Sequence, residues 1–369
     1  MNSYKKKSSL EQYFAENIYV MRLNTLINRF ARWLDGSGRD SNIVISSRVR
    51  LARNLQNFPF PDKAKHNILR QVVNVIKEKY TKVDNLKDSL YIDVNEISEI
   101  DRQFLMERRL ISPDLAHRKL PSGLIIGKDE LISIMINEED HLRIQSLQPG
   151  LEINKAWEAI SRIDDELAEM VEFSFSEQYG YLTACPTNVG TGMRVSVFIH
   201  LAGLTMSGKL ETIIKDKIPG EITMRGFYGE GTEALGNIFQ ISNQLTLGRT
   251  EQGILDRLIN VAESFIKMEK EARQRLLNYE RIKLEDKIGR SVGVIKHAKV
   301  INSIEVINLL SLLRLGIDLN LTQHIEKKEL NEIMVLVQPA HLQKYYGKML
   351  DSNERDILRA NLLRKKLNL

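Results

Sequence analysis

Apolar residues recur at helical spacing in some segments of the chain and alternate with polar residues in others. The helical pattern predicts helices over residues 23–34, 68–80, 97–110 and 153–170. Strand-like runs bounded by polar turns occupy residues 43–51, 124–127, 131–137, 181–184, 194–201, 222–227 and 237–247. Because few helices interleave the later strands, we predict an α+β fold with a mainly antiparallel sheet flanked by helices.

The pattern changes near residue 250, after which helical periodicity continues to the end with few glycines. We therefore expect three parts: a polar leader over residues 1–21, a first domain over 22–254 that carries the candidate chemistry, and an all-helical domain over 255–369. Met21 would serve as an alternative start.

Composition limits the compartments and ligands that are expected for this protein. No apolar run among the 369 residues approaches the roughly 18 to 20 residues that span a bilayer, so we expect no membrane association. The single cysteine excludes an internal disulfide and suits a reducing cytoplasm. A formal net charge of +5 is compatible with nucleic-acid binding or with handling of polyphosphate.

Arginines on the predicted strands favour polyphosphate. Arg48 and Arg50 lie two residues apart, so on a strand both point to one face. Arg143, Arg194 and Arg225 stand at the ends of other polar runs. A guanidinium pairs bidentately with phosphate oxygens, and several around one groove would hold a triphosphate. The usual phosphate loop and protein-kinase motifs are absent from the sequence, as are metal-binding spacings of the CxxC or HExxH kind, so we predict no protein-bound metal site.

Four segments resemble, in family order, the catalytic segments of the phosphagen (guanidino) kinases. They are Ser-Ser-Arg-Val-Arg at 46–50, Asn-Glu-Glu-Asp-His-Leu-Arg at 137–143, Cys-Pro-Thr-Asn-Val-Gly-Thr-Gly-Met-Arg at 185–194, and Arg-Gly-Phe-Tyr-Gly-Glu at 225–230. Each segment is modest evidence alone, but the ordered set is highly specific.

The resemblance implies that ATP is the donor, that its phosphates are bound by the arginines, and that Mg²⁺ bridges them. It implies nucleotide contacts at Ser47, Arg48, Val49, Arg50, Leu51, Arg143, Arg194, Val195, Ser196, Val197, Phe198, Arg225, Gly226, Phe227, Tyr228, Gly229 and Glu230. Arg109, before Leu-Ile-Ser-Pro, matches a nucleotide-contacting basic residue of the protein-arginine branch. Glu139 and Glu230 would clamp the acceptor guanidinium, with Cys185 beside it as a third catalytic group.

Two features favour arginine in a protein as the acceptor. Only 45 residues precede Ser46, too few for the helical lid domain with which small-guanidine kinases close over their substrates. In the tail, Arg355 and Arg359 lie one turn apart with Asp356 beside them. The Arg355–Ala360 run resembles the phosphoarginine-binding RDxxRA motif of bacterial protein-arginine kinases of the McsB type, which implies an allosteric site at Arg355, Asp356, Arg359 and Ala360.

The same resemblance implies a cellular role and partners. Such kinases act in stress response, mark proteins for a Clp protease and its ATPase, inactivate a heat-shock repressor, need a zinc-binding activator (McsA-like), and form homodimers through the helical domain. We expect no direct binding of nucleic acid.

Other interpretations stay open from the residues alone. Arg48 and Arg50 could line a solvated strand face, Arg355 and Arg359 a charged helix face, and Cys185 could be an inert thiol. The acceptor could be free arginine or another small guanidine. A third hypothesis, a non-catalytic nucleic-acid-binding or adaptor protein, is opposed by the carboxylates next to Arg143 and Arg225.

Overall fold

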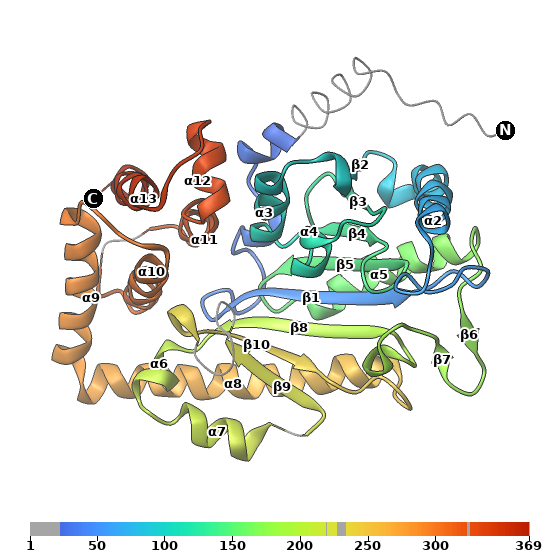
Figure 1. Ribbon diagram of the computed structural model, residues 1–369. Helices are drawn as coiled ribbons and strands as arrows, with labels where there is room; N and C mark the ends of the chain where they lie inside the picture. Colours follow the sequence, from blue (N-terminus) through green and yellow to red (C-terminus); the bar gives the residue numbers. More distant parts are fainter. Residues whose placement is uncertain (1–22, 219, 227–233, 323–324, 369) are drawn as a thin grey trace.

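A single antiparallel sheet organises the first two-thirds of the protein (Figure 1). The computed structural model describes residues 23–218, 220–226, 234–322 and 325–368. Eight strands pair in the order β2-β3-β4-β5-β1-β8-β10-β9, and every neighbouring pair is antiparallel. Their bounds are β1 Val44–Arg53, β2 Leu90–Asp93, β3 Gly123–Ile126, β4 Ile132–Ile136, β5 Leu142–Pro149, β8 Met193–His200, β9 Ile222–Gly226 and β10 Ile238–Asn243. A separate hairpin joins β6 Phe175–Ser176 and β7 Gly180–Tyr181.

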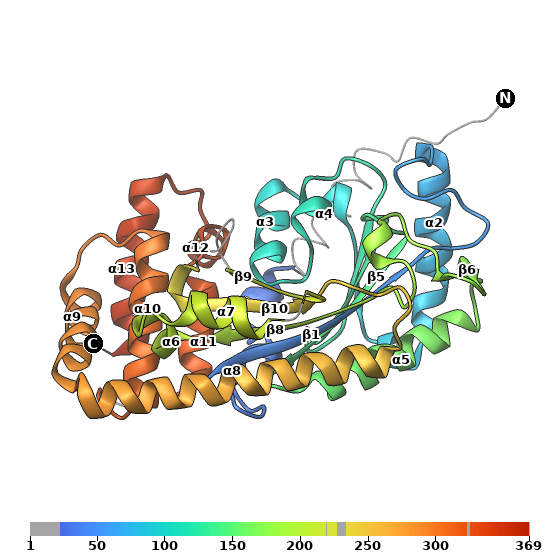
Figure 2. The same cartoon turned by 90° about the horizontal axis from the view of Figure 1, so that it is seen from below.

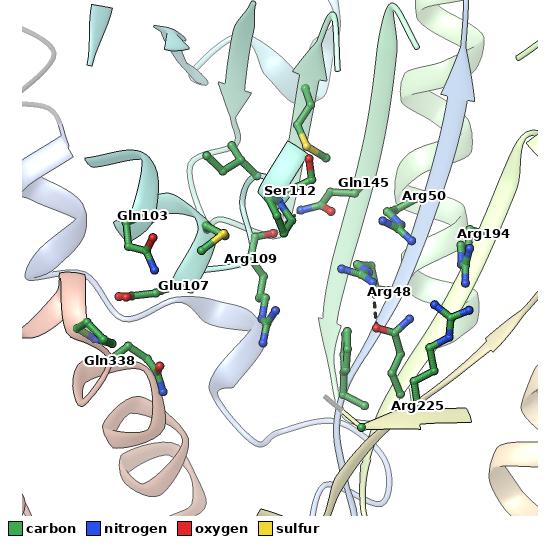
Figure 3. Close-up of a pocket in the computed structure, with 18 of the residues that line it drawn as sticks. Arg48, Arg50, Gln103, Glu107, Arg109, Ser112, Gln145, Arg194, Arg225 and Gln338 are labelled. Atoms are coloured by element: carbon green, nitrogen blue, oxygen red, sulfur yellow. Dashed lines mark hydrogen bonds between the residues drawn. The ribbon is translucent and has the colours of Figure 1, made fainter. Parts of the chain in front are cut away.

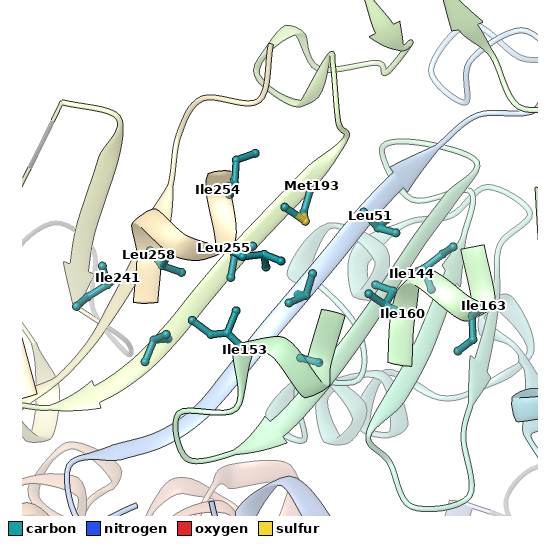
Figure 4. Close-up of a cluster of buried hydrophobic side chains, with 14 of the residues drawn as sticks. Leu51, Ile144, Ile153, Ile160, Ile163, Met193, Ile241, Ile254, Leu255 and Leu258 are labelled. Atoms are coloured by element: carbon teal, nitrogen blue, oxygen red, sulfur yellow. The ribbon is translucent and has the colours of Figure 1, made fainter. Parts of the chain in front are cut away.

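Two long helices cover one face of this sheet. The helices α5 (Ile153–Ala168) and α8 (Glu251–Tyr279) pack against the central strands (Figure 2). Their apolar sides form one buried cluster with alternate residues of the strands, such as Leu51, Ile144 and Ile241 (Figure 4). Because side chains alternate along a strand, the residues between these project to the opposite face, where the polar groups gather.

Shorter helices flank the other parts of the sheet. They are α2 His66–Lys79, α3 Glu99–Glu107, α4 Pro113–His117, α6 Ala202–Met206 and α7 Leu210–Lys217. Ser98 and Ser112 each accept a hydrogen bond from a backbone N–H in the first turn of α3 and α4, and so begin these helices.

The C-terminal region is helical and packs against one end of the sheet. It contains α9 Arg281–His297, α10 Ser303–Asp318, α11 Lys327–Leu336, α12 Pro339–Tyr346 and α13 Ser352–Leu367. Its core includes Ile45, Leu147, Phe198 and Ile238 from the strands as well as residues of the helices. These helices therefore share a hydrophobic core with the sheet, and α12 packs against α3 (Figure 1).

The predicted fold class, an antiparallel sheet flanked by helices with a helical C-terminal region, is confirmed. Most predicted helices and strands fall within a few residues of the observed bounds. The helix predicted over 23–34 is interrupted: residues 23–27 are helical, and a separate 3₁₀ turn covers Arg32–Leu34. The strands β2, β5 and β6 and the helices α4, α6 and α7 were not predicted, and the strand expected at 181–184 is reduced to its first residue.

The boundary expected at residue 255 falls inside α8, whose Ile254, Leu255 and Leu258 belong to the core shared with the sheet. The expected leader over 1–21 lies outside the described residues. No helix among the described residues is both long and apolar enough to cross a membrane.

Candidate active site

Strand register brings arginines from distant segments onto the face of the sheet opposite α5 and α8. Arg50 of β1 lies directly opposite Arg194 of β8. Arg48 lies opposite Ser196, and on the neighbouring pair Gln240 of β10 lies opposite Arg225 of β9. Because alternate residues of each strand face the same side of the sheet, arginines that are far apart in the sequence form one basic surface.

A cavity of about 730 Å³ lies over this surface. Arg48, Arg50, Arg194 and Arg225 line one side, while Arg109 reaches in from the segment after α3 (Figure 3). The remaining lining comes from α3, the start of α4, β4, β5 and the C-terminal helices. Four of the five arginines predicted to bind phosphate therefore meet in one cavity, together with Arg109, which was predicted to contact the nucleotide; Arg143 is not among the lining residues.

The electrostatics of this face call for an anionic ligand. Burial and the charges of Arg109, Arg143 and Arg194 lower the pKa of Arg48 to about 9. Burial, together with the neighbouring arginines, also lowers the pKa of Arg50 and of Arg194. The Nε atoms of Arg50 and Arg194 are buried with no hydrogen-bond partner among the described residues. Phosphate oxygens would supply the missing acceptors and the missing negative charge.

An acidic loop lies next to the cavity, at Arg143, and is linked to its wall through Ser112. Glu138 is buried and accepts hydrogen bonds from Arg143 and from Ser112, while Glu139 lies 3.8 Å from Arg143. Burial opposes ionisation of Glu138, but Arg143 and the hydrogen bonds outweigh it and lower its pKa. Burial and the adjacent carboxylates raise the pKa of Glu139, whose side chain keeps 36% of its exposure. One carboxylate is thus held ionised beside an arginine, and the other is accessible with a raised proton affinity.

The loop of Cys185 is fixed next to these carboxylates. Asp140 accepts hydrogen bonds from Asn54 and from the backbone N–H of Ala184, at 2.6 and 2.7 Å. The Sγ atom of Cys185 lies 3.0 Å from the hydroxyl of Thr187. Phe227, Tyr228, Gly229 and Glu230 lie outside the described residues, so the approach of Glu230 to Glu139 stays a prediction.

The other predicted nucleotide contacts divide between the two faces. Ser196 and Phe198 lie on the arginine face, where Ser196 accepts a hydrogen bond from Arg48 and the guanidinium of Arg48 stacks 5.1 Å from the ring centre of Phe198. Gly226 also lines the cavity. The alternate residues Val49, Leu51, Val195 and Val197 point into the apolar core, and Ser47 bonds to the carbonyl of Gly150, so these can offer the cavity only backbone atoms.

The sequence interpretation missed several polar groups of the site. Gln145 lies opposite Arg50 and donates a hydrogen bond of 2.6 Å to the carbonyl of Arg109, which fixes that residue. Gln240 accepts from Arg48 at 3.5 Å. Prediction of β5 would have revealed Gln145, because it follows Arg143 at the spacing of two that places both on one face.

The predicted phosphoarginine motif lies on α13, outside this cavity. Arg359 is buried and donates to the carbonyls of Val337 and Ile301, at 2.8 and 2.9 Å, and to Asp356. Arg355 donates to the carbonyl of Leu350, and Ala360 is buried in the helical core. In this arrangement Arg359 is engaged by its own chain, and Arg355 and Asp356 remain the more accessible members of the motif.

No cluster of three or more carboxylate, histidine or cysteine ligands that could hold a metal ion occurs among the described residues. The cavity instead presents guanidinium groups, which suit a polyphosphate.

An arginine-lined cavity beside an acidic loop and a cysteine loop, on an antiparallel sheet, defines a phosphotransferase of the phosphagen-kinase type. Residues 70–272 match the family model of the ATP:guanido phosphotransferase C-terminal catalytic domain, and residues 281–369 match that of the protein-arginine kinase McsB C-terminal domain. The chain belongs to the ATP:guanido phosphotransferase family, in the protein-arginine kinase group.

Similar proteins and structures agree with this membership. A protein-arginine kinase of Halothermothrix orenii is 43% identical over 350 residues, which is 95% of this chain and 100% of that protein. One of Bacillus pumilus is 43% identical over 341 residues, covering 92% and 94% of the two chains. Lombricine kinase superposes on 69% of this chain and 78% of its own with a TM-score of 0.57 at 24% identity, which shows the shared fold. The duplicated taurocyamine kinase of Schistosoma mansoni gives 0.55 at 24% identity, over 69% of this chain and 38% of that one.

Proposed function

We propose that this protein transfers the γ-phosphoryl group of ATP to the guanidinium group of arginine side chains in proteins. The observation that carries the proposal is the buried guanidinium face of Arg48, Arg50 and Arg194, which ends at Glu138 and Glu139. We propose that the arginines bind the phosphates of ATP and that the carboxylates beside them hold the acceptor guanidinium in line with the γ-phosphorus. The names of the similar proteins and the match of the C-terminal region support arginine in a protein as the acceptor.

The chemistry of the acceptor explains the carboxylates. An arginine side chain has a pKa above roughly 12, so its nitrogen lone pair is not available at neutral pH. A carboxylate that holds the planar cation in line with the γ-phosphorus can accept a proton from the attacking nitrogen as the N–P bond forms and the bond to the ADP oxygen breaks. Glu139, with its raised pKa and partial exposure, suits this role, and Glu230 is proposed as its partner.

The arginine face stabilises the charge that moves during transfer. Negative charge is spread over the equatorial oxygens of a loose phosphoryl transition state and grows on the leaving ADP. Donors already fixed in a buried site stabilise that charge without having to reorganise. Mg²⁺ bound to the phosphates would neutralise further charge, and its protein contacts would be few because the described residues offer no metal cluster.

The identity of the acceptor can be tested by kinetics. Release of ADP is measured in a coupled assay with equal concentrations of arginine residues, supplied either as an unfolded arginine-rich protein or as free arginine. We expect turnover with the protein and little with free arginine. Faster turnover with free arginine would reassign the protein to the small-guanidine kinases.

Glu230→Gln separates chemistry from binding. The variant removes the proposed second carboxylate but keeps the size of the side chain, so transfer should fall while ATP affinity, measured by calorimetry, is retained. A Glu230→Gln enzyme with full transfer activity would exclude the two-carboxylate arrangement.

We further propose that the modified proteins include a heat-shock repressor and that modified proteins are directed to a Clp ATPase and protease. A zinc-binding activator stimulates the kinase, and the active form is a cytoplasmic homodimer. Phosphoarginine binds at Arg355 and Asp356 as a regulator. The resemblance of the tail motif and the family membership support these proposals. Calorimetry with a phosphoarginine peptide tests the last of them: Arg355→Ala should abolish its binding, and retained binding would exclude the site.

A further inference from the structure

The strand register fixes the direction of the cavity. Along β1, Ala52 lies opposite Arg143 at the acidic end, Arg50 lies opposite Arg194 in the middle, and Ser46 lies opposite Phe198 at the other end. A nucleotide whose terminal phosphate reaches the acidic end must therefore place its base and ribose at the end of Phe198.

On the side opposite Arg50 and Arg194 the cavity wall carries several neutral groups beside Glu107 and Arg109 (Figure 3). Gln103 and Met106 come from α3, Ser303 is the first residue of α10, and Gln338 and Pro339 begin α12. The amide groups of Gln103 and Gln338 lie on the opposite side of the cavity from Arg50 and Arg194 (Figure 3). Amides, a hydroxyl and apolar side chains suit a heterocyclic base, whereas phosphates need the cations at the other end.

Two buried contacts hold the segment that carries Gln338. Glu107 of α3 accepts hydrogen bonds from the backbone N–H groups of Ala340 and His341, at 2.9 and 3.0 Å, and so fixes the first turn of α12. On the preceding residue, the carbonyl of Val337 accepts from Arg359. This wall of the cavity is therefore positioned before a ligand binds.

The amide of Gln338 is itself oriented. Its Nε2 donates to the carbonyl of Met334 at 3.1 Å, one turn back on α11. The Oε1 atom remains as an acceptor, which matches the exocyclic amino group of adenine and opposes the O6 carbonyl of guanine.

From these positions we infer that the C-terminal helices form the base-binding end of the nucleotide site. Gln338 accepts a hydrogen bond from the amino group of adenine, and Ser303 and Gln103 contribute to the same base and ribose pocket. The nucleotide then bridges the sheet and the helical region. This inference rests on the proposed use of ATP as the donor and adds residues that determine base specificity.

The experiment measures KM and kcat for ATP and GTP in the wild type and in Gln338→Met, which keeps the length of the side chain but removes the amide. We expect KM for ATP to rise roughly three- to tenfold, the effect of one neutral hydrogen bond, with the loss in KM rather than in kcat. The ratio of kcat/KM for ATP to kcat/KM for GTP should decrease. Affinity for inorganic tripolyphosphate with Mg²⁺, which carries no base, should stay unchanged.

Gln274→Met, on the exposed surface of α8, is the matched control and should leave every constant unchanged. An unchanged KM for ATP in Gln338→Met, or an equal loss of tripolyphosphate affinity, would overturn the inference while leaving the proposed function intact. Failure of the wild type to bind ATP at all would instead overturn the proposed function and this inference with it.

Discussion

The sheet and the C-terminal helices both bury arginines, but they use them in opposite ways. On the arginine face, Arg50 and Arg194 repel their arginine neighbours, and their buried Nε atoms have no hydrogen-bond partner in the described part of the chain. In the helical region, Arg359 is buried among two carbonyls and a carboxylate of its own chain. Leaving buried donors unpaired costs stability, so the first arrangement is expected where a ligand completes the pairing. By this comparison Arg359 is structural, whereas Arg50 and Arg194, whose Nε atoms have no partner among the residues that the structure describes and lie at a cavity lined by other arginines, mark a binding site.

Replacing an unpaired arginine should affect catalysis far more than folding. In Arg50→Gln we expect kcat/KM for phosphoryl transfer to fall by roughly a thousandfold or more, because a charge that stabilises the transferring group is lost. The urea midpoint should be unchanged or higher, since an unpaired buried cation is removed. Marked loss of stability with activity retained would show that Arg50 serves the fold.

Arg359→Met tests the opposite case. Removal of this guanidinium leaves Asp356 and the carbonyls of Val337 and Ile301 without their donor, and we expect the free energy of unfolding to fall by about 3 kcal/mol. Urea unfolding followed by circular dichroism measures the change. Arg355→Met, on the same helix but more exposed, is the control and should cost far less. Equal stability of the Arg359→Met and wild-type proteins would contradict the structural assignment.

Weakening the contact between the sheet domain and the C-terminal helices should lower stability by an intermediate amount. Glu107→Gln removes the charge that α3 presents to the start of α12 and weakens the hydrogen bonds to Ala340 and His341. We expect a loss of about 1 to 2 kcal/mol in unfolding free energy. If α12 is held by its other contacts alone, the variant will unfold at the wild-type urea concentration.

The smallest expected effect is the pH dependence of ATP affinity. The pKa of Arg48 is about 9 in the folded protein, well below that of a free arginine side chain, so this residue loses its charge as pH rises through 9. ATP affinity should be constant between pH 7 and 8 and then decline, by at most about tenfold per pH unit. The free energy of unfolding should instead increase as pH rises through 9. Arg48 binds its proton more tightly in the unfolded chain, so the cost of burying its charge disappears when the folded protein loses that proton. Titration calorimetry from pH 7 to 10 checks this, and affinity that rises above pH 9 would contradict it.

The sequence predicted the elements whose periodicity is regular and missed those whose pattern is short or mixed. β1 and β8 were found because their alternation is clear, and with them Arg48, Arg50 and Arg194. β5 was missed because the acidic loop before it and the polar residues within it, such as Gln145, hide the alternation of Ile144 with its neighbours.

The base-binding end could not be predicted by this route. Gln338 and Ser303 lie at helix starts far along the chain and carry no motif. Tertiary packing brings them to the cavity, for Gln338 through the contact of α12 with α3. The engagement of Arg359 by the carbonyls of Val337 and Ile301 is likewise a product of tertiary packing, which helical spacing cannot reveal.

The central claim is that the buried arginine face, by binding the phosphates of ATP, supports transfer of a phosphoryl group to arginine. Its most direct test is tandem mass spectrometry, under neutral conditions, of an arginine-rich protein incubated with this enzyme, ATP and Mg²⁺, with the Arg50→Gln enzyme in parallel. The account predicts acid-labile phosphorylation on arginine nitrogen with the wild type and almost none with the variant. Phosphorylation confined to serine, threonine or tyrosine, or equal phosphoarginine with both enzymes, would contradict it.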